Sequence, residues 1–357
     1  MWSTAGGPRR GRFHTPRGTV ETPAFMPVGT NATVKALTPD EVAESGAQMI
    51  LCNAFHLYLR PGQEIVAGAG GLHGFMGWPG PILTDSGGYQ VFSLAAMRTV
   101  DDGGVTFRSP FDGSVHRFTP ERVVDLQRAL GADIQMPLDV CLGYPHEPAQ
   151  AREALEQTLR WAVRAREHHG RSGSGLLFGI VQGGVAPDLR AEAARRTAAL
   201  DFAGYAVGGL SVGEPRELTY ALLAPVIAGL PPERPRYLMG MGEPRGLLEG
   251  IARGIDLFDC ALPTRVARTG TIFTATGRLN IRNAIYRDDM RPPDPACTCR
   301  VCTGTSRAYL RHLFKADEML GPRLATYHNL FFVGRLLEGA RAALDEGRYS
   351  AWMAEIL

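Results

Sequence analysis

Apolar and polar residues follow one another along this chain in a recurring unit, a helix-like stretch followed by a short strand-like run. A threonine or glutamate followed by proline opens the helical stretch, a glycine closes it, and mostly apolar residues come next. The clearest examples cover residues 38–46, 119–131 and 243–254, and residues 187–200 and 215–230 behave similarly. Because proline is favoured at the first helical position and glycine just past the last, this punctuation predicts where the helices begin and end.

The apolar runs between these helices predict eight strands. Continuous apolar strands that alternate with amphipathic helices are typical of a parallel sheet covered on both faces. Eight such units over roughly 235 residues match the usual size of a closed (β/α)8 barrel (TIM barrel), which is the fold we expect, with a doubly wound open sheet as the alternative. The glycine-rich run at 68–74 lacks a strand–turn–helix context and is interpreted as a flexible loop. The strands are expected at 24–30, 48–53, 81–85, 133–139, 176–182, 205–210, 236–240 and 255–259.

Composition narrows the class of protein. A chain of 357 residues with 45% hydrophobic content can bury a large core. It has no run of about 18 apolar residues for a membrane span and no apolar stretch of a secretory signal near its start. Six cysteines, three of them close together, suit a reducing cytoplasm better than a disulfide framework. We expect the other three, Cys52, Cys141 and Cys260, to be buried thiols.

Three cysteines in C-T-C-R-V-C, together with a histidine in T-Y-H-N-L, predict a metal site. Cys297, Cys299, Cys302 and His328 would complete a tetrahedral shell for one zinc ion and leave no position for water. Such a closed shell holds structure, so this zinc would be structural and the chemistry would lie elsewhere. The alternative is three free cysteines and an unrelated histidine.

Basic residues are concentrated around these ligands. Between residues 264 and 315 there are ten arginines and lysines against three acids, although the net charge of the whole chain is only +2. This surplus is consistent with a surface that binds a phosphate backbone, and equally with a solvated arginine-rich face. We expect one catalytic domain, 1–357, that contains a zinc-binding, arginine-rich insertion at 264–335 after the last strand, and a closing helix at 336–357.

Polar residues stand at the ends of several predicted strands, where barrel enzymes carry their reactive groups. These residues are Asp85, Asp139, Gln182, the Gly208-Gly209-Leu210 run and Asp259. A single strand-end aspartate is often a helix cap, and Asp85 before S-G-G could be one. Three converging carboxylates favour substitution at the anomeric carbon of a sugar, in which one attacks C1′ and another manages the leaving group's proton. A retaining glycoside hydrolase fits that pattern too, but only 8% of the residues are aromatic.

The remaining polar groups would suit a guanine. The Asp139 carboxylate can accept the N1–H and the exocyclic N–H, and Gln182 can donate to O6. Backbone amides at Gly208 and Gly209 can approach closely because no Cβ intrudes. Tyr89 and Met239 are candidate faces for the flat ring.

Four motifs resemble those of bacterial tRNA-guanine transglycosylases, the queuine tRNA-ribosyltransferase family: T-D-S-G-G-Y-Q-V-F-S-L, Y-A-V-G-G-L-S-V-G-E, D-L-F-D-C-A-L-P-T-R, and C-T-C-R-V-C with H-N-L. The resemblance covers almost the whole chain. It implies a zinc-containing (β/α)8 barrel that exchanges guanine at the wobble position of G-U-N anticodon tRNAs (Asp, Asn, His and Tyr type) for 7-aminomethyl-7-deazaguanine in queuosine biosynthesis. It also implies a cytoplasmic homodimer.

By motif, the resemblance assigns a role to each site residue. Asp259 would be the nucleophile and Asp85 the general acid/base, and Glu214 would support the Gly209–Leu210 peptide region, where the incoming aminomethyl group is sensed. Asp139, Gln182, Gly209 and Leu210 would read the base edge between Tyr89 and Met239, and Arg265 and Arg268 would contact the anticodon neighbours.

One feature departs from the family pattern: Val140 stands where the family usually has an acid after the pocket aspartate. We expect no archaeal-type RNA-binding extension, which fits the bacterial branch. A non-catalytic RNA-binding subunit of the same fold is the main alternative. It would be expected to lack one of the two catalytic acids, both of which are present here.

Overall fold

Eight parallel strands form a closed barrel in the computed structural model, which describes residues 6–93, 98–172 and 174–357. The strand order β3-β13-β12-β11-β10-β9-β5-β4 is closed by a parallel bridge between Val28 and Leu51. The predicted barrel is therefore confirmed, and the open sheet is excluded. All eight strands begin within the expected runs or one or two residues from them: β3 (Ala24–Pro27), β4 (Ile50–Asn53), β5 (Ile82–Asp85), β9 (Ile134–Gln135), β10 (Leu176–Val181), β11 (Gly204–Val207), β12 (Arg236–Leu238) and β13 (Leu257–Cys260).

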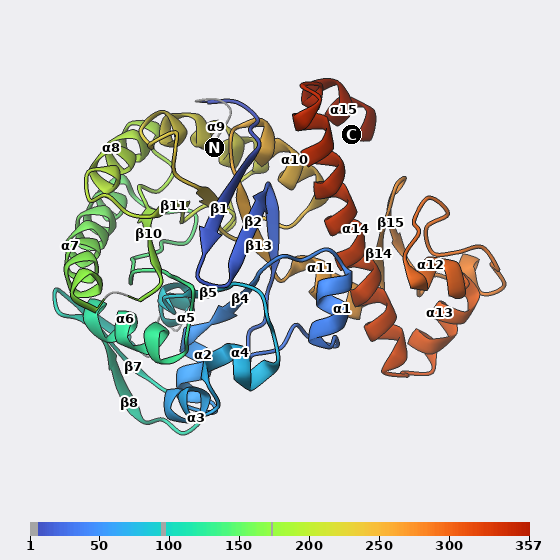
Figure 1. The fold of residues 1–357 in the computed structure, drawn as a ribbon, viewed down its shortest axis with the longest axis horizontal. Helices are drawn as coiled ribbons and strands as arrows, with labels where there is room; N and C mark the ends of the chain where they lie inside the picture. The colour runs from blue at the N-terminus through green and yellow to red at the C-terminus, as the bar shows by residue number, and fades with distance from the viewer. Residues whose placement is uncertain (1–5, 94–97, 173) are drawn as a thin grey trace.

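Helices cover the outside of the barrel, with α7, α8 and α9 at its periphery in Figure 1. Thr38 forms a capping box with Glu41, and the Thr119 side chain accepts from the backbone N–H of Arg122, so the predicted helix starts are confirmed. The run at 68–74 is not a loop as expected, because it lies mostly in α3 and α4. The helices between the strands are α1 (Pro39–Glu44), α2 (Ala54–Leu59), α3 (Gln63–Gly68), α4 (Gly71–Met76), α5 (Gly88–Ser93), α6 (Pro120–Ala129), α7 (Pro148–Ser172), α8 (Pro187–Ala198), α9 (Arg216–Ala228) and α10 (Pro244–Ala252).

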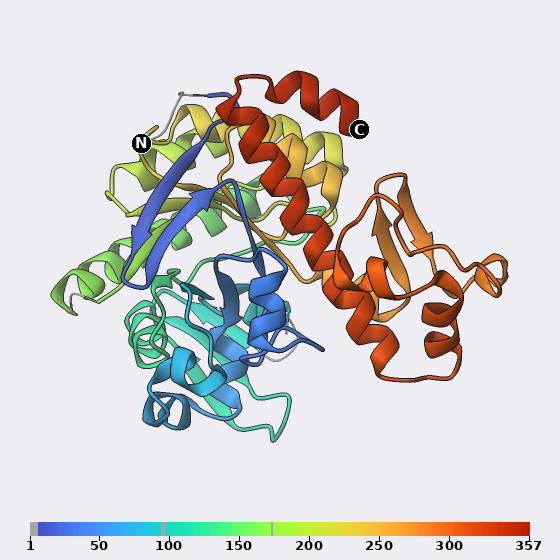
Figure 2. The ribbon, with the colours of Figure 1, turned by 45° about the vertical axis from the view of Figure 1, so that its right-hand side comes forward.

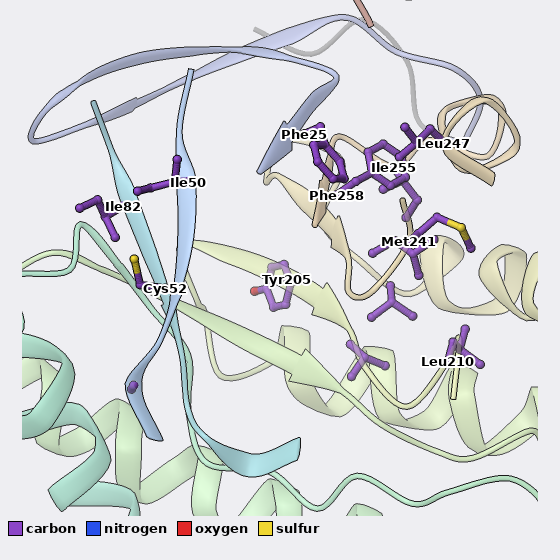
Figure 3. Packing of buried hydrophobic residues seen from close by; sticks show 14 of the residues in the cluster. Phe25, Ile50, Cys52, Ile82, Tyr205, Leu210, Met241, Leu247, Ile255 and Phe258 are labelled. Atoms are coloured by element: carbon purple, nitrogen blue, oxygen red, sulfur yellow. The ribbon is translucent and has the colours of Figure 1, made fainter. Parts of the chain in front are cut away.

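Alternation along the strands divides the core in two. Even-numbered Ile50 and Ile82 pack in a cluster that includes the surrounding helices, part of which Figure 3 shows. Their neighbours Leu51 and Leu83 belong to a second cluster made of strand residues, which fills the barrel. Because side chains alternate along a strand, a strand-end residue two positions beyond an inward-facing residue also faces the barrel axis. Asp85 stands in that relation to Leu83.

Two small sheets flank the barrel. The hairpin of β1 (Gly11–Thr15) and β2 (Gly18–Thr22) adds Phe13 and Val20 to the cluster inside the barrel. A three-stranded antiparallel sheet is inserted in the sequence between β5 and α6. It consists of β6 (Arg98–Asp101), β7 (Gly104–Arg108) and β8 (Val115–Phe118).

Within the segment after β13, residues 271–315 form a lobe at the side of the barrel (Figure 2). The 26-residue helix α14 runs between this lobe and the barrel, and the boundary expected at residue 335 lies inside it. The buried Glu41 of α1 accepts hydrogen bonds from Arg300 and Arg323, which ties the lobe to the barrel. No helix among the described residues has the length and apolar character needed to cross a membrane. The elements of this segment are α11 (Leu262–Arg268), β14 (Thr271–Thr274), β15 (Gly277–Asn280), η2 (Ala284–Tyr286), α12 (Arg300–Gly304), α13 (Arg307–Lys315), α14 (Leu320–Asp345) and α15 (Tyr349–Ile356).

Candidate active site and metal cluster

A cavity of about 550 Å³ lies at the carboxyl ends of the barrel strands. Glu214 and Arg268 do not line it, but every other site residue expected at this end of the barrel does. These lining residues are Asp85, Tyr89, Asp139, Gln182, Gly208, Gly209, Leu210, Met239, Asp259 and Arg265. The space exceeds what one purine needs, so a base and part of its ribose can share it.

Asp259 is placed on β13 two residues after the inward-facing Leu257. Its Oδ1 accepts a hydrogen bond of 2.6 Å from the Tyr237 hydroxyl and one of 2.9 Å from the Gly240 N–H. Burial raises the pKa of Asp259, the two hydrogen bonds oppose that rise, and the charge of Asp85 adds to it. These two donors hold the carboxylate by one oxygen, and the second oxygen accepts no hydrogen bond from the described part of the chain.

Asp85 ends β5 and is buried beside Asn53, its paired residue on β4. The Asn53 amide and the Gln90 amide both donate to Oδ2, the latter at 2.8 Å, and the Ala54 N–H donates to Oδ1 at 2.9 Å. Burial raises the pKa of Asp85 against these donors, in the direction expected for a proton donor.

Asp139 follows the short strand β9 and faces Gln182, which follows β10. The Gln182 Nε2 donates to Asp139 Oδ2 at 2.7 Å, and Ser86 Oγ lies 3.4 Å from Oδ1. Burial raises the pKa of Asp139 to about 6; hydrogen bonds from Gln182 and Ser86 oppose the rise and the charge of Asp85 adds to it. The charge of Asp85 thus acts on both other carboxylates, so the three lie within electrostatic range of one another in one cavity.

The loop after β11 brings backbone groups against this pair. Gly209 has a φ of +64°, and a Cβ there would lie 2.3 Å from Gln182 Oε1, so only glycine fits. Behind this loop, Glu214 accepts hydrogen bonds from the Ser211 N–H, the Val212 N–H and the Thr219 hydroxyl. Burial raises the pKa of Glu214, but these hydrogen bonds outweigh it and the pKa is lowered. Glu214 therefore supports the loop as an ionised carboxylate.

The remaining expected residues lie around the mouth. Tyr89 is 61% exposed, and Met239 is half-buried on the cavity wall. Arg265 is exposed at the edge, whereas Arg268 is half-buried outside the cavity, and its Nη1 has no hydrogen-bond partner among the described residues. Val140 packs in the outer core, and its N–H donates to Thr158 Oγ1 at 3.0 Å.

Sequence reasoning missed three residues that hold the carboxylates. Asn53 could have been found, because it ends a predicted strand just as Asp85 does. Gln90 lies in a quoted motif but was given no role there. Tyr237 lies within an apolar strand, and only the alternation of inward and outward positions marks it as a barrel-facing hydroxyl. The expected thiols Cys141 and Cys260 are half-buried on the cavity wall, while Cys52 is fully buried.

The three cysteines of the lobe and the α14 histidine come together as predicted. The ligand atoms of Cys297, Cys299, Cys302 and His328 all lie within 4.8 Å of one another. His328 Nδ1 is 3.4 Å from Cys299 Sγ and 3.3 Å from Cys302 Sγ. In a tetrahedral zinc site with Zn–S bonds of about 2.3 Å and Zn–N bonds of about 2.0 Å, the sulfur and nitrogen ligand atoms are roughly 3.5 Å apart, close to these distances.

The surroundings prepare this cluster for a metal. His328 Nε2 is 2.7 Å from the Phe273 carbonyl, which requires a proton on Nε2 and leaves Nδ1 free as a ligand. The Asp294 N–H points at Cys302 Sγ at 3.4 Å, a contact that favours a thiolate. The four ligand types, the distances between the ligand atoms and the hydrogen bonds to His328 and Cys302 therefore all fit a tetrahedral metal ion.

Comparison with known proteins agrees with this arrangement of cavity and cluster. The family model described as queuine tRNA-ribosyltransferase matches residues 4–357. A queuine tRNA-ribosyltransferase of Desulforamulus reducens is 55% identical over 349 residues, covering 98% of this chain and 94% of the relative. Its counterpart from Pelotomaculum thermopropionicum is 57% identical, covering 96% and 92%, and one from Symbiobacterium thermophilum is 53% identical, covering 99% and 88%. The chain belongs to the queuine tRNA-ribosyltransferase family.

Proposed function

We propose that this enzyme exchanges guanine at the wobble position of G-U-N anticodon tRNAs for 7-aminomethyl-7-deazaguanine, through a covalent bond between Asp259 and the ribose. One observation carries the proposal: Asp85, Asp139 and Asp259 line a single cavity broad enough for a purine nucleoside. All three accept hydrogen bonds, but three carboxylates desolvated around one cavity are costly to keep for folding alone.

In the first step, a carboxylate oxygen of Asp259 attacks C1′ of the target ribose and the C1′–N9 bond breaks. The electron pair of that bond leaves with guanine, which receives a proton from Asp85. The donors Tyr237 and Gly240 favour the ionised form of the attacking carboxylate against the effect of its burial, and the burial of Asp85 favours its protonated form.

In the second step, the incoming 7-deazaguanine binds in place of guanine and gives its N9 proton to the Asp85 carboxylate. Its N9 attacks C1′, the bond from C1′ to Asp259 breaks, and Asp259 leaves as a carboxylate. Asp85 ends protonated, so each cycle restores both acids.

The base would be read by hydrogen bonds along one edge. Asp139 accepts the N1–H and the exocyclic amine, while Gln182 and the Gly209 N–H donate to O6. Tyr89 and Met239 contact the two faces of the ring. Glu214 supports the Leu210–Ser211 peptide, whose carbonyl accepts from the aminomethyl group of the incoming base.

The target nucleotide must leave its stack to reach the cavity, at a cost of a few kcal/mol that is smallest in an unpaired loop. Arg265 at the mouth and Arg268 beside it would contact the neighbouring nucleotides of the anticodon loop. This basic edge and the arginine-rich lobe support tRNA as the partner.

For the metal cluster, we propose one Zn²⁺ held by Cys297, Cys299, Cys302 and His328. Bound there, zinc would supply no catalysis, because its four protein ligands leave no position for substrate. Its effect would be to hold the start of α12 against α14.

The covalent step has a direct test. Wild-type protein mixed with tRNA should yield a shifted RNA band on a denaturing gel, and Asp259→Asn should not. Asp201→Asn is the matched control, because Asp201 is exposed and lies outside the cavity. Equal trapping by wild type and Asp259→Asn would overturn the nucleophile, and wild type that exchanges no radiolabelled guanine into tRNA would overturn the activity.

The location and assembly follow from the family resemblance. We propose a cytoplasmic homodimer. Light scattering of the purified protein should give twice the chain mass of 38.6 kDa, and a mass of one chain at micromolar concentration would contradict it.

A further inference from the structure

Arg190, in the first turn of α8, is fully buried. Its guanidinium donates to four backbone carbonyls: Nε to Gly184 at 2.7 Å, Nη1 to Val181 at 3.2 Å and Gly208 at 2.7 Å, and Nη2 to Gly209 at 3.0 Å. No salt bridge involves it among the described residues. A buried cation paired only with carbonyls is costly to keep, so its geometry needs a reason beyond packing.

The four carbonyls belong to two loops that line the cavity. Val181 ends β10 and Gly184 lies two residues after Gln182, while Gly208 and Gly209 follow β11. Gly208, Gly209 and Gln182 all line the cavity, whereas Arg190 does not. The guanidinium therefore lies behind both loops, on the side away from the substrate.

The direction of the carbonyls fixes the direction of the amides. In a trans peptide the C=O and the following N–H point to opposite sides. Because the Gly208 carbonyl points to Arg190, the Gly209 N–H points away from it, to the cavity side, where the Cys141 thiol is its neighbour. Holding this carbonyl with a charged donor also polarises the peptide and makes its N–H a stronger donor.

The geometry points to Arg190 as a positioning residue for base recognition, which holds the Gly208–Gly209 peptide so that its N–H meets the O6 of guanine. This inference rests on the proposed function. Only arginine suits the task, because its planar fork reaches carbonyls on two loops at once, and a lysine ammonium is a single point that cannot.

The experiment compares Arg190→Lys with wild type in guanine exchange into tRNA, using guanine and 6-thioguanine as competing bases. In 6-thioguanine a weakly accepting sulfur replaces O6, while the groups that face Asp139 are unchanged. We expect Arg190→Lys to raise the guanine KM about tenfold and to weaken 6-thioguanine by less than about threefold, the difference being one hydrogen bond. The kcat at saturating guanine should change less than KM.

Arg236→Lys is the matched control. Arg236 is another buried arginine, at the start of β12 and away from the cavity. It should lower thermal stability and leave the preference for guanine over 6-thioguanine at the wild-type value. If Arg190→Lys lowers both affinities equally, or neither, Arg190 is only structural and the inference is wrong.

Should Arg190→Lys fail to fold, crystals of wild type with and without guanine decide the matter. The Gly208 and Gly209 carbonyls should stay hydrogen-bonded to the guanidinium in both crystals, and in the guanine complex the Gly209 N–H should donate to O6. A Gly208–Gly209 peptide turned away from Arg190 in the guanine complex would overturn the inference. Wild type that exchanges no guanine would instead overturn the proposed function, so the two failures are distinguishable.

Discussion

The Tyr237 hydroxyl donates a 2.6 Å hydrogen bond to Oδ1 of Asp259, from the neighbouring strand of the barrel. Both side chains face the barrel axis, since Tyr237 belongs to the inner cluster and Asp259 follows the inward-facing Leu257 by two positions. Burial raises the pKa of Tyr237 well above its usual value, so it stays a neutral donor. This donor opposes the effect of burial on the nucleophile.

Tyr237→Phe should therefore raise the pKa of Asp259, because the ionised carboxylate loses a hydrogen bond that its protonated form needs less. Asp259 must be ionised to attack, so the acid limb of the kcat profile should move to higher pH. At a pH on that acid limb we expect kcat to fall about tenfold, because one lost hydrogen bond to a charged group moves the pKa by about one unit.

Tyr205→Phe provides the comparison for this change. Tyr205 lies on β11, and its hydroxyl donates to the Ala198 carbonyl outside the cavity. Removal of this hydroxyl should lower the thermal stability and leave the acid limb of the kcat profile where it is. An acid limb that stays in place in Tyr237→Phe, or that moves equally in Tyr205→Phe, would contradict the role of Tyr237.

Asn53→Ala should change the basic limb of the pH–rate profile and extend the active range, whereas Tyr237→Phe narrows it on the acid side. The Asn53 amide favours the ionised form of Asp85, so its removal raises the pKa of Asp85 further. Because the first step needs Asp85 protonated, activity should persist to higher pH by about one unit.

The basic limb of the profile should vanish in Asp85→Asn, with kcat reduced about 10²–10⁴-fold. A pH–rate profile in which Asp85→Asn keeps the wild-type limbs would remove Asp85 from acid/base catalysis.

The strands could be predicted from the sequence because a parallel strand buried on both faces, such as 176–181, has no polar side chain. The barrel then brings strand ends together whatever their separation along the chain, which explains why Asp85 and Asp259 could be expected in one cavity. The bounds were less certain where strand pairing ends early, as at 133–139, of which only Ile134–Gln135 is paired. There the chain turns to bring Asp139 toward Gln182.

Contacts between side chains set by the barrel's closure could not be read from the sequence. Arg190 appears in the sequence as one more arginine in an amphipathic helix, and nothing local shows that four carbonyls from two loops converge on it. The metal ligands were easier to find, since three of the four lie within six residues of one another.

Guanine binding should depend on the ionisation of Asp139. Burial raises its pKa to about 6, and only the ionised form accepts both N–H groups of guanine. The group is ionised above its pKa and protonated below it, so the guanine KM should be constant above pH 7 and about tenfold higher at pH 5. Measuring KM for guanine and for tRNA from pH 5 to 8 checks this, since the tRNA KM should lack that transition. A guanine KM that is flat over this range would contradict an ionised Asp139 as the acceptor.

Loss of one ligand should release the metal and loosen the lobe. Cys302→Ser removes a thiolate that is buried beside Cys299 and His328, so elemental analysis should fall from one zinc per chain to a small fraction of that. Protease cleavage should then increase in the lobe, because the start of α12 is no longer joined to α14, while the barrel, whose interior cluster contains no residue of the lobe, should resist. Cys52→Ser is the control, a buried thiol on β4 outside the cluster, and it should keep its zinc. A Cys302→Ser protein with a full zinc content would show that these four residues are not the ligand set.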